Sequence, residues 1–236
     1  MKDNDNDKIG GNIVTMKCKA VIFDLDGTLL DTLADLTYAV NVTMENRSVP
    51  THTPEEVRSF IGDGAEMLIR RALPVGTPDD EVKSATAEYK QTYLDNLLRE
   101  TKPYDGIPEI LKILKDRGIK TAVVSNKYYK STKELCDIFF PEIDVVMGEM
   151  EERGIKRKPS PDMLLSVMDT LGVTPDEVIY SGDSDVDVIT SKNAGVQCIS
   201  VLWGFQDRDR LVSAGARYVA SHPSEIPSIV EEIEKA

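Results

Sequence analysis

Long hydrophobic runs are missing from this sequence. No stretch of about 18 consecutive apolar residues occurs, so we expect no segment that crosses a membrane. The first fifteen residues are polar and contain glycines, and they lack the apolar segment of a secretory signal peptide. We expect residues 1–15 to form a flexible tail, and we expect the protein to have no membrane partner.

Cysteine and histidine are also scarce. The three cysteines, Cys18, Cys136 and Cys198, are odd in number and far apart, without the paired spacing of zinc or redox sites. We therefore expect free thiols and a reducing compartment, the cytoplasm. Neither of the two histidines, His52 and His222, lies in a recognisable motif, so no metal or catalytic role is predicted for them.

Basic residues are few relative to acidic ones. The chain has 28 Lys and Arg against 41 Asp and Glu, which gives a formal charge of −13. This balance disfavours nonspecific binding to nucleic acid or to anionic membranes. Hydrophobic residues make up 41% of the chain, enough for a folded core, and a monomer and a homodimer both remain open.

Short apolar runs alternate with helical patterns over most of the chain. The runs expected to be buried strands are 20–23, 121–125, 144–147, 178–181 and 198–202. The expected helices are 107–117, 131–139, 161–171, 186–194 and 225–234. Such alternation predicts an α/β fold whose parallel sheet is covered on both faces, with ligands at the carboxyl ends of the strands.

One region interrupts this alternation. Between the first and second predicted strands the sequence indicates only helices, at 33–47, 55–60, 66–73 and 79–100. We interpret residues 33–100 as an inserted all-helical cap, and residues 16–32 with 101–236 as the α/β core. Because the insertion begins just after the first strand, we expect the cap to cover the end of that strand.

The segment 21–32 carries the strongest chemical signal. A β-branched strand ends at Asp24 and Asp26, which leave the strand on the same side because side chains alternate with a period of two. Gly27 allows a sharp turn, and Thr28 adds a hydroxyl. Two neighbouring carboxylates repel unless a proton or a cation such as Mg²⁺ separates them, and a carboxylate can also attack phosphorus. The segment therefore predicts a metal-assisted phosphoryl site.

Three other strand ends carry suitable side chains. Ser125 and Asn126 follow the second strand and can donate hydrogen bonds to phosphate oxygens. Lys158 precedes a predicted helix and can neutralise a phosphoryl group. Asp183 follows a later strand and can complete the metal site, while Asp187 is expected to orient ligands or metal-bound waters.

These residues resemble the motifs of the haloacid dehalogenase superfamily. The matching segments are Asp-Leu-Asp-Gly-Thr at 24–28, Ser-Asn at 125–126, Lys-Pro at 158–159 and Gly-Asp-Ser-x-x-Asp at 182–187. The resemblance covers about residues 17–230 and implies a Rossmann-like core with a four-helix cap. Within the superfamily the chain is most similar to phosphoglycolate phosphatases. The segments that carry this closer similarity are 57–65, 71–73, 201–205 and 214–216.

The resemblance implies a mechanism. Asp24 would attack phosphorus and become an aspartyl phosphate, while Asp26 would protonate the leaving oxygen and then activate water. Mg²⁺ would be held by the Asp24 carboxylate, the Asp26 backbone carbonyl and Asp183. The residues implied to hold the phosphoryl oxygens are Thr28, Ser125, Asn126 and Lys158.

The cap is expected to choose the substrate. Gly62, Asp63 and Gly64 indicate a loop whose bare backbone can approach a small ligand. Arg58 is either a group that binds a carboxylate, as in 2-phosphoglycolate, or an ordinary residue of a helix surface. The expected reaction is Mg²⁺-dependent hydrolysis of a small phosphate monoester, with 2-phosphoglycolate as the expected substrate.

Other functions stay open. A sugar-phosphate mutase would use the same aspartyl phosphate, but its relatives carry a histidine behind the first motif, and residues 33–36 contain none. A pyrophosphatase or nucleotidase would share the whole site. A phospho-ligand-binding protein without turnover would be expected to lack Asp24, Asp26 or Asp183, and all three are present.

Overall fold

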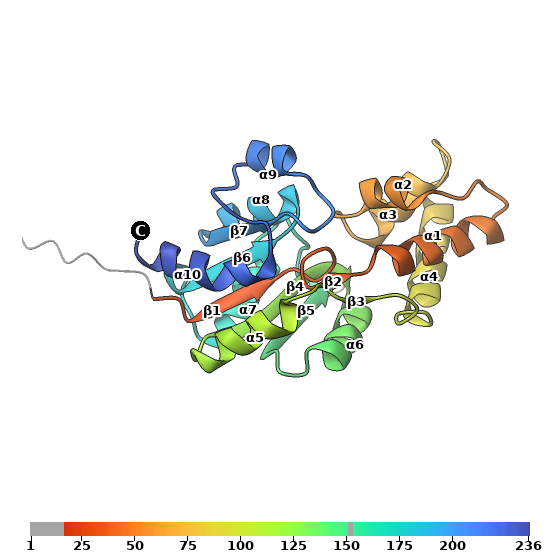
Figure 1. Ribbon diagram of the computed structural model, residues 1–236. Coiled ribbons are helices and arrows are strands. Elements are labelled where there is room, and N and C mark those ends of the chain that lie inside the picture. The colour runs from red at the N-terminus through yellow and green to blue at the C-terminus, as the bar shows by residue number, and fades with distance from the viewer. Residues whose placement is uncertain (1–16, 151–152) are drawn as a thin grey trace, which may run out of the picture.

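The computed structural model describes residues 17–150 and 153–236, so the tail predicted for residues 1–15 lies outside the described part. Its centre is a six-stranded sheet with the strand order β5-β4-β1-β6-β7-β8 (Figure 1). All neighbouring strands are parallel. The strands are β1 (Ala20–Phe23), β4 (Lys120–Tyr128), β5 (Val145–Glu149), β6 (Val178–Gly182), β7 (Gln197–Val201) and β8 (Tyr218–Ala220).

Helices cover both faces of this sheet. Along β1, Val21 and Phe23 belong to one apolar cluster, whereas Ala20 and Ile22 belong to the other, as the alternation of side chains requires. The first cluster includes residues of α5 (Ile107–Asp116), α6 (Tyr129–Phe139) and α10 (Ile226–Glu234). The second includes residues of α7 (Asp162–Leu171) and α8 (Asp185–Ala194). β1 is therefore buried on both faces.

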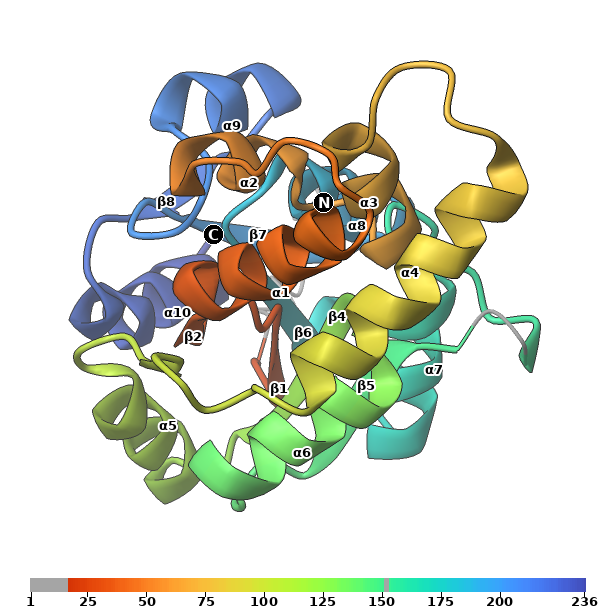
Figure 2. The same cartoon turned by 90° about the vertical axis from the view of Figure 1, so that its right-hand side faces the viewer.

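Four helices form a cap over the carboxyl ends of the strands (Figures 1 and 2). They are α1 (Leu33–Asn46), α2 (Pro54–Phe60), α3 (Ala65–Ala72) and α4 (Asp79–Leu94). Val40, Ile69 and Val82, from three of these helices, are fully buried in one cluster. The α/β fold with an inserted helical cap is thus confirmed. The boundaries 33–100 for the cap stay a prediction, and α4 ends earlier than the predicted helix 79–100.

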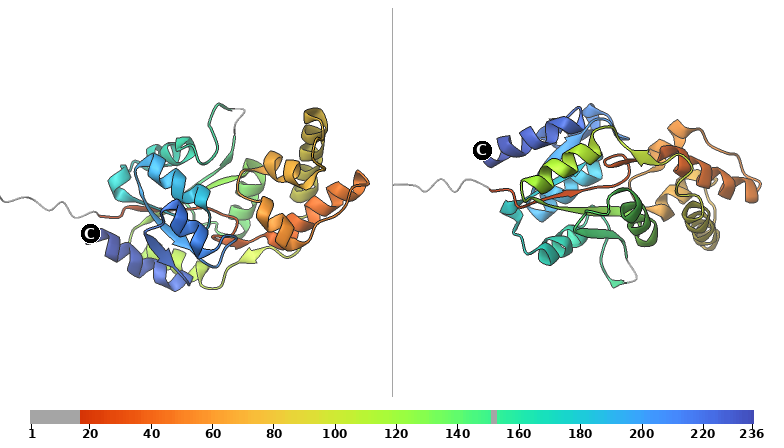
Figure 3. Two further views of the ribbon diagram at one scale, coloured as in Figure 1. Left: turned by 90° about the horizontal axis from the view of Figure 1, so that it is seen from above. Right: turned by 60° about the horizontal axis from the view of Figure 1, so that its bottom comes forward.

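The two chain segments that join cap and core run side by side. β2 (Leu30–Asp31) pairs antiparallel with β3 (Lys102–Pro103). Asp35, almost fully buried, accepts hydrogen bonds from Glu100 N at 2.9 Å and from Thr101 N at 2.9 Å. In both views of Figure 3 the cap accordingly lies at one end of the core.

Several short elements were not predicted from the sequence. They are β2, β3, β8, α9 (Arg208–Ala214) and the 3₁₀ helices η2 (Pro175–Glu177) and η3 (Pro223–Glu225). β8 forms one edge of the sheet, next to β7. Among the described residues, no helix is both long and apolar enough to cross a membrane.

Candidate active site

The turn after β1 brings the first motif against a distant strand end. Asp24 N donates to Ser181 O at 2.8 Å, which continues the pairing of β1 with β6 beyond Phe23. Gly27 then turns the chain with φ +81°, and a Cβ added to it would lie 2.4 Å from Asp183 Oδ2. Glycine is therefore needed here twice, for the backbone conformation and for the close approach of Asp183.

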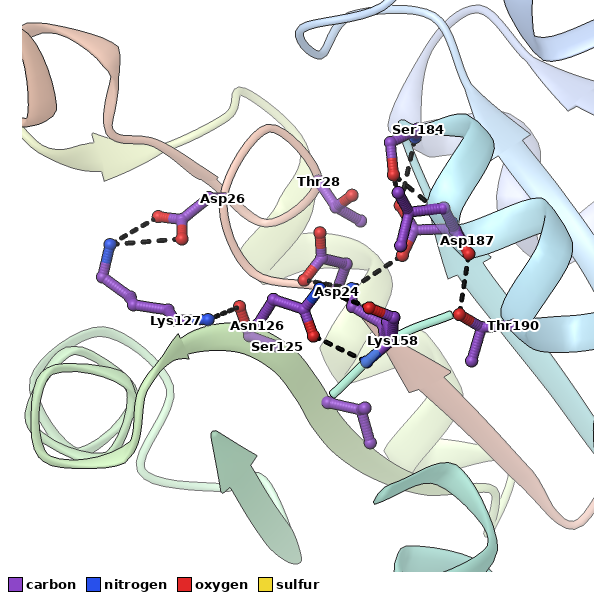
Figure 4. A network of polar contacts seen from close by, with 12 residues as sticks. Asp24, Asp26, Thr28, Ser125, Asn126, Lys127, Lys158, Ser184, Asp187 and Thr190 are labelled. Carbon is purple, nitrogen blue, oxygen red and sulfur yellow. Dashed lines mark hydrogen bonds and ion pairs between the residues drawn. The ribbon is translucent and has the colours of Figure 1, made fainter. Parts of the chain in front are cut away.

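Three buried carboxylates meet at this edge of the sheet. Carboxylate oxygens of Asp24, Asp183 and Asp187 all lie within 4.8 Å of one another. Lys158 Nζ lies 2.9 Å from Asp24 Oδ1 and 2.7 Å from Asp187 Oδ1, at the centre of Figure 4. On the described part of the chain, Lys158 pairs with two of the three carboxylates, and three acids against one ammonium leave an excess of buried negative charge that calls for a further cation.

The protonation behaviour of the cluster reflects that imbalance. Burial raises the pKa of Asp24 to about 7; Lys158 opposes the shift, and the charges of Asp187 and Asp26 add to it. Burial, Asp187 and Asp24 raise the pKa of Asp183 well above its usual value. Burial alone would lower the pKa of Lys158, but the charges of Asp187 and Asp24 raise it. A set of crowded oxygen donors of this kind can bind a hard divalent metal ion.

The carboxylate of Asp187 is bonded to neighbouring residues of the protein. It is fully buried, and it accepts hydrogen bonds from Ser184 N at 3.0 Å, Ser184 Oγ at 2.6 Å and Tyr180 OH at 2.9 Å, besides its contact with Lys158. The bond from Ser184 N, together with the bond that Asp187 N donates to Ser184 Oγ at 3.3 Å, forms the N-terminal capping box of α8. Asp187 therefore fixes the ammonium of Lys158 beside Asp24, and its predicted role in orienting ligands or metal-bound waters stays a prediction.

The side-chain amide of Asn126 is bonded within the protein, so the phosphate-binding role predicted for Asn126 stays a prediction. Its Oδ1 accepts from Lys158 N at 2.8 Å, and its Nδ2 donates to Lys158 O and to Gly62 O, both at 2.9 Å. Both amide hydrogens are thus used to tie the Lys158 segment and the cap loop to β4. The neighbouring Ser125 lines the cavity, and its Oγ accepts from Lys127 N at 3.2 Å, so its own hydroxyl hydrogen can be donated to a ligand.

Thr28 also has a partner inside the protein, and its role in phosphate binding stays a prediction. The residue is fully buried, and its hydroxyl donates to Asp183 Oδ1 at 3.2 Å. The other oxygen of Asp183 accepts from Phe205 N at 2.7 Å. Trp203 Nε1 donates to Thr28 O at 3.0 Å, which joins the loop after β7 to the loop after β1. Thr28 therefore orients a carboxylate of the cluster and does not face the cavity.

Asp26 points away from the acidic cluster (Figure 4). Lys127 Nζ lies 2.8 and 3.1 Å from its two carboxylate oxygens, and Thr32 Oγ1 donates to Oδ1 at 2.7 Å. Lys127 is absent from the predicted site residues. The signal in the sequence is its position, directly after the Ser-Asn pair at the carboxyl end of a central strand.

A cavity of about 440 Å³ lies between this edge of the sheet and the cap. Asp24, Asp26, Lys158 and Asp183 line its core side. The cap side is lined by residues that include Arg58, Gly62, Gly64, Ala65, Tyr89 and Tyr93. Most of the predicted strand-end residues and most of the predicted cap residues therefore face one shared space, whereas Thr28 and Asp187 do not line it.

Two of the predicted cap residues have other partners. Asp63 does not line this cavity: its carboxylate forms an ion pair with Arg71 on the cap, and its backbone carbonyl accepts from Arg157 at 3.1 Å. Arg58 lines the cavity, but its guanidinium donates to the backbone carbonyls of Gly204, at 2.9 Å, and Phe205. Arg58 thus ties the cap to the loop that holds Asp183, and carboxylate binding by Arg58 stays a prediction.

Comparisons with known proteins agree with the motifs. The family model described as "Haloacid dehalogenase-like hydrolase" matches residues 21–201. The chain is 32% identical over 216 residues to a phosphoglycolate phosphatase of Aquifex aeolicus, covering 90% of this chain and 97% of the relative. It is 28% identical to an N-acetylmuramic acid 6-phosphate phosphatase of Pseudomonas aeruginosa, covering 92% and 96%.

Solved structures agree as well. A crystal structure from Lactobacillus delbrueckii subsp. bulgaricus, whose assignment as a phosphoglycolate phosphatase is itself provisional, superposes with a TM-score of 0.86 at 34% identity. The superposition covers 91% of this chain and 99% of that chain.

Proposed function

Because the chain belongs to the haloacid dehalogenase-like hydrolases and is a phosphoric monoester hydrolase, we propose that it hydrolyses 2-phosphoglycolate with Asp24 as the nucleophile. The observation that carries this proposal is the buried cluster of Asp24, Asp183 and Asp187 around Lys158, which faces a capped cavity. The three free cysteines fit the cytoplasm as its compartment.

We assign each step of the reaction to a side chain that lines the cavity. An oxygen of Asp24 forms a bond to phosphorus while the bond to the glycolate oxygen breaks, and Asp26 gives that oxygen a proton. Water then attacks the aspartyl phosphate, Asp26 takes its proton, and inorganic phosphate leaves. Lys158, 2.9 Å from Asp24, offsets negative charge on the nucleophile and the phosphoryl group, and Ser125 donates to a phosphoryl oxygen.

The cluster fits magnesium. Its donors are carboxylate oxygens, and the single ammonium of Lys158 leaves the three acids with excess negative charge. Asp24, Asp183 and the backbone carbonyl of Asp26 would hold the ion, which when bound would screen the charge of the phosphoryl group and the nucleophile. Calorimetric titration of metal-free protein with Mg²⁺ tests this assignment without any turnover. We expect Asp183→Asn to weaken the binding at least tenfold.

The cavity favours a second candidate substrate. Its volume of about 440 Å³ exceeds what a two-carbon phosphate fills, and pockets of this size take much larger ligands. The relative named N-acetylmuramic acid 6-phosphate phosphatase acts, by its name, on a sugar phosphate of that larger kind. We keep N-acetylmuramic acid 6-phosphate as the alternative, and the names of several relatives favour 2-phosphoglycolate.

Phosphate release from a panel of substrates tests the proposal. The panel contains both candidates, a nucleoside monophosphate, pyrophosphate and a hexose 1-phosphate, each assayed with Mg²⁺ and with EDTA. We expect 2-phosphoglycolate to have the highest kcat/KM, EDTA to abolish the reaction, and Asp24→Asn to be inactive. Full activity of Asp24→Asn would remove the nucleophile from the proposal. Transfer to a second sugar hydroxyl without free phosphate would identify a mutase instead.

A further inference from the structure

Lys127 has an unusual position. Its side chain is only 6% exposed, yet it lines the cavity between cap and core. Its ammonium contacts both oxygens of Asp26 and lies over the ring of Tyr93 from α4, 4.0 Å from the ring centre. A buried cation is thus held at the junction of β4 with the cap, paired with a group that takes part in the proposed reaction.

The proposed reaction separates this ion pair. To protonate the leaving oxygen, Asp26 must take up a proton from solvent and turn toward the phosphoryl group that is passing to Asp24, whereas here its carboxylate points toward Lys127 (Figure 4). That turn would leave a buried ammonium without its carboxylate, which is strongly unfavourable. A second anionic group on the substrate, placed on the part that leaves with the oxygen, would restore the pair.

The other described cations that line the cavity have partners that need not move in the reaction. Arg58 donates to two backbone carbonyls, and Lys90 pairs with Glu149 at 3.2 Å. Arg210 pairs with Asp185 at 2.9 Å. Lys158 remains between Asp24 and Asp187. Among the described cations that line the cavity, Lys127 is therefore the one whose carboxylate partner has to move.

We propose that Lys127 is a specificity-determining residue, which binds a carboxylate of the leaving group when Asp26 turns to the phosphoryl group. This inference rests on the proposed function and deepens it, because it defines the substrate class as phosphate monoesters whose alcohol carries a carboxylate. Both candidate substrates are acids of this kind. The ring of Tyr93 keeps the ammonium in place during the exchange of partners.

Comparison of 2-phosphoglycolate with an analogue that lacks the carboxylate measures the contribution of that carboxylate to kcat/KM. 2-Hydroxyethyl phosphate has the size of 2-phosphoglycolate with a hydroxymethyl group in place of the carboxylate. We expect wild-type protein to prefer 2-phosphoglycolate, and we expect Lys127→Gln to lower that preference in kcat/KM by about 10- to 100-fold, mainly through KM. Lys127→Arg keeps the charge and is expected to keep most of the preference.

Two matched variants serve as controls. Lys90→Gln removes a cation from the same cavity, and Lys130→Gln removes an exposed lysine three residues farther along the chain. Neither is expected to change the preference between the two substrates. A selective loss of preference in Lys90→Gln instead of Lys127→Gln would overturn the assignment. Equal losses of Lys127→Gln on both substrates would also overturn it, because Lys127 would then act only by positioning Asp26.

A binding measurement covers the case in which Lys127→Gln does not fold. Asp26→Asn frees the ammonium, so we expect it to bind 3-phosphonopropionate more tightly, relative to 3-hydroxypropylphosphonate, than wild-type protein does. The double variant Asp26→Asn/Lys127→Met removes both buried charges and is expected to lose that gain. An unchanged ratio in Asp26→Asn would refute the exchange of partners.

Failure of the proposed function has a different signature. If wild-type protein releases phosphate from 2-hydroxyethyl phosphate and 2-phosphoglycolate equally well, the substrate assignment is wrong before any variant is made. If wild-type protein prefers 2-phosphoglycolate and Lys127→Gln keeps that preference in full, the substrate stands and only the role of Lys127 is refuted.

Discussion

Gly204 lies where two loops meet behind the acidic cluster, and Gly204→Ala tests how that cluster is held. A Cβ added to Gly204 would lie 2.3 Å from Asp183 Cβ and 2.3 Å from Gly27 O. Neither atom is the end of a flexible side chain, so one of the two loops has to move. The loop that carries Gly204 also provides Phe205 N to Asp183 at 2.7 Å and two carbonyls to Arg58.

The expected size of the effect of Gly204→Ala on stability and on kcat/KM follows from these contacts. Overpacking of a tight site costs about 1–3 kcal/mol of unfolding free energy. Displacement of the Phe205 amide removes a hydrogen bond to a charged carboxylate, and such a bond contributes about 1.5–3 kcal/mol. We therefore expect Gly204→Ala to weaken Mg²⁺ activation and to lower kcat/KM by about tenfold to a hundredfold.

Gly118 provides the matched control for this substitution. It has φ +73°, and beyond its two neighbours in sequence no described residue has an atom within 4 Å of an added Cβ, so Gly118→Ala introduces backbone strain alone. That strain costs about 1–2 kcal/mol, comparable with the loss expected at Gly204. Urea unfolding and Mg²⁺ titration of phosphate release are measured for both variants. If Gly204→Ala loses stability but keeps wild-type Mg²⁺ dependence and kcat/KM, the argument that this loop positions Asp183 is wrong.

Four further predictions follow from buried or bridging groups. Lys158→Met leaves Asp24 and Asp187 without their cation, so the unfolding free energy should fall by about 3–5 kcal/mol in urea titrations. Arg58→Ala removes both hydrogen bonds from α2 to the core loop and should speed backbone hydrogen exchange in that loop, whereas Arg71→Ala should not. In metal-free protein, prepared with EDTA, burial raises the pKa of Asp24 from its ordinary 3.8 to about 7. Between these two pH values the folded state keeps a proton on Asp24 that the unfolded state has lost. Stability of the metal-free protein should therefore fall as the pH rises from 5 to 8, and less so for Asp24→Asn. Burial raises the pKa of each thiol to about 12, so iodoacetamide at pH 8 should label native protein orders of magnitude more slowly than unfolded protein. The thiols concerned are Cys18, Cys136 and Cys198.

The sequence predicted the central architecture because the signals there are long and local. β1, β4, β5, β6 and β7 are apolar runs flanked by helices, and a parallel sheet follows from that alternation. The cap was predictable for the same reason, as a long region with helical periodicity and no strand pattern.

Short pairings were not predictable in this way. β2 and β3 have two residues each, and their pairing joins Leu30 to Pro103 across the whole cap. β8 has three residues and is defined by its neighbour β7 rather than by its own composition. Such elements depend on contacts between distant segments, and no local sequence pattern predicts them.

Residue types were easier to predict than hydrogen-bond partners. Because the carboxyl ends of parallel strands meet at one edge of a sheet, the sequence predicted that Asp24 and Asp183 lie close together. The two residues are 159 positions apart in sequence (183 minus 24), and their carboxylates belong to one cluster. The sequence did not predict that the hydroxyl of Thr28 is bonded to Asp183. Nor did it predict that the side-chain amide of Asn126 is bonded to Lys158 and Gly62. A buried polar group takes whichever partner the packing provides, and that choice is not visible in a motif.

Two carboxylates of the cavity are held in different ways, and this difference suits their different tasks. Asp183 is enclosed by the backbone of Gly27 and Gly204 and bonded to a backbone amide, so it cannot turn without moving a loop. Asp26 is held only through side chains, those of Lys127 and Thr32, on the described part of the chain. A metal ligand must keep its position through the reaction, whereas a general acid must reach the leaving oxygen and later the attacking water. The rigid support of Asp183 and the exchangeable support of Asp26 therefore match a fixed ligand and a mobile acid.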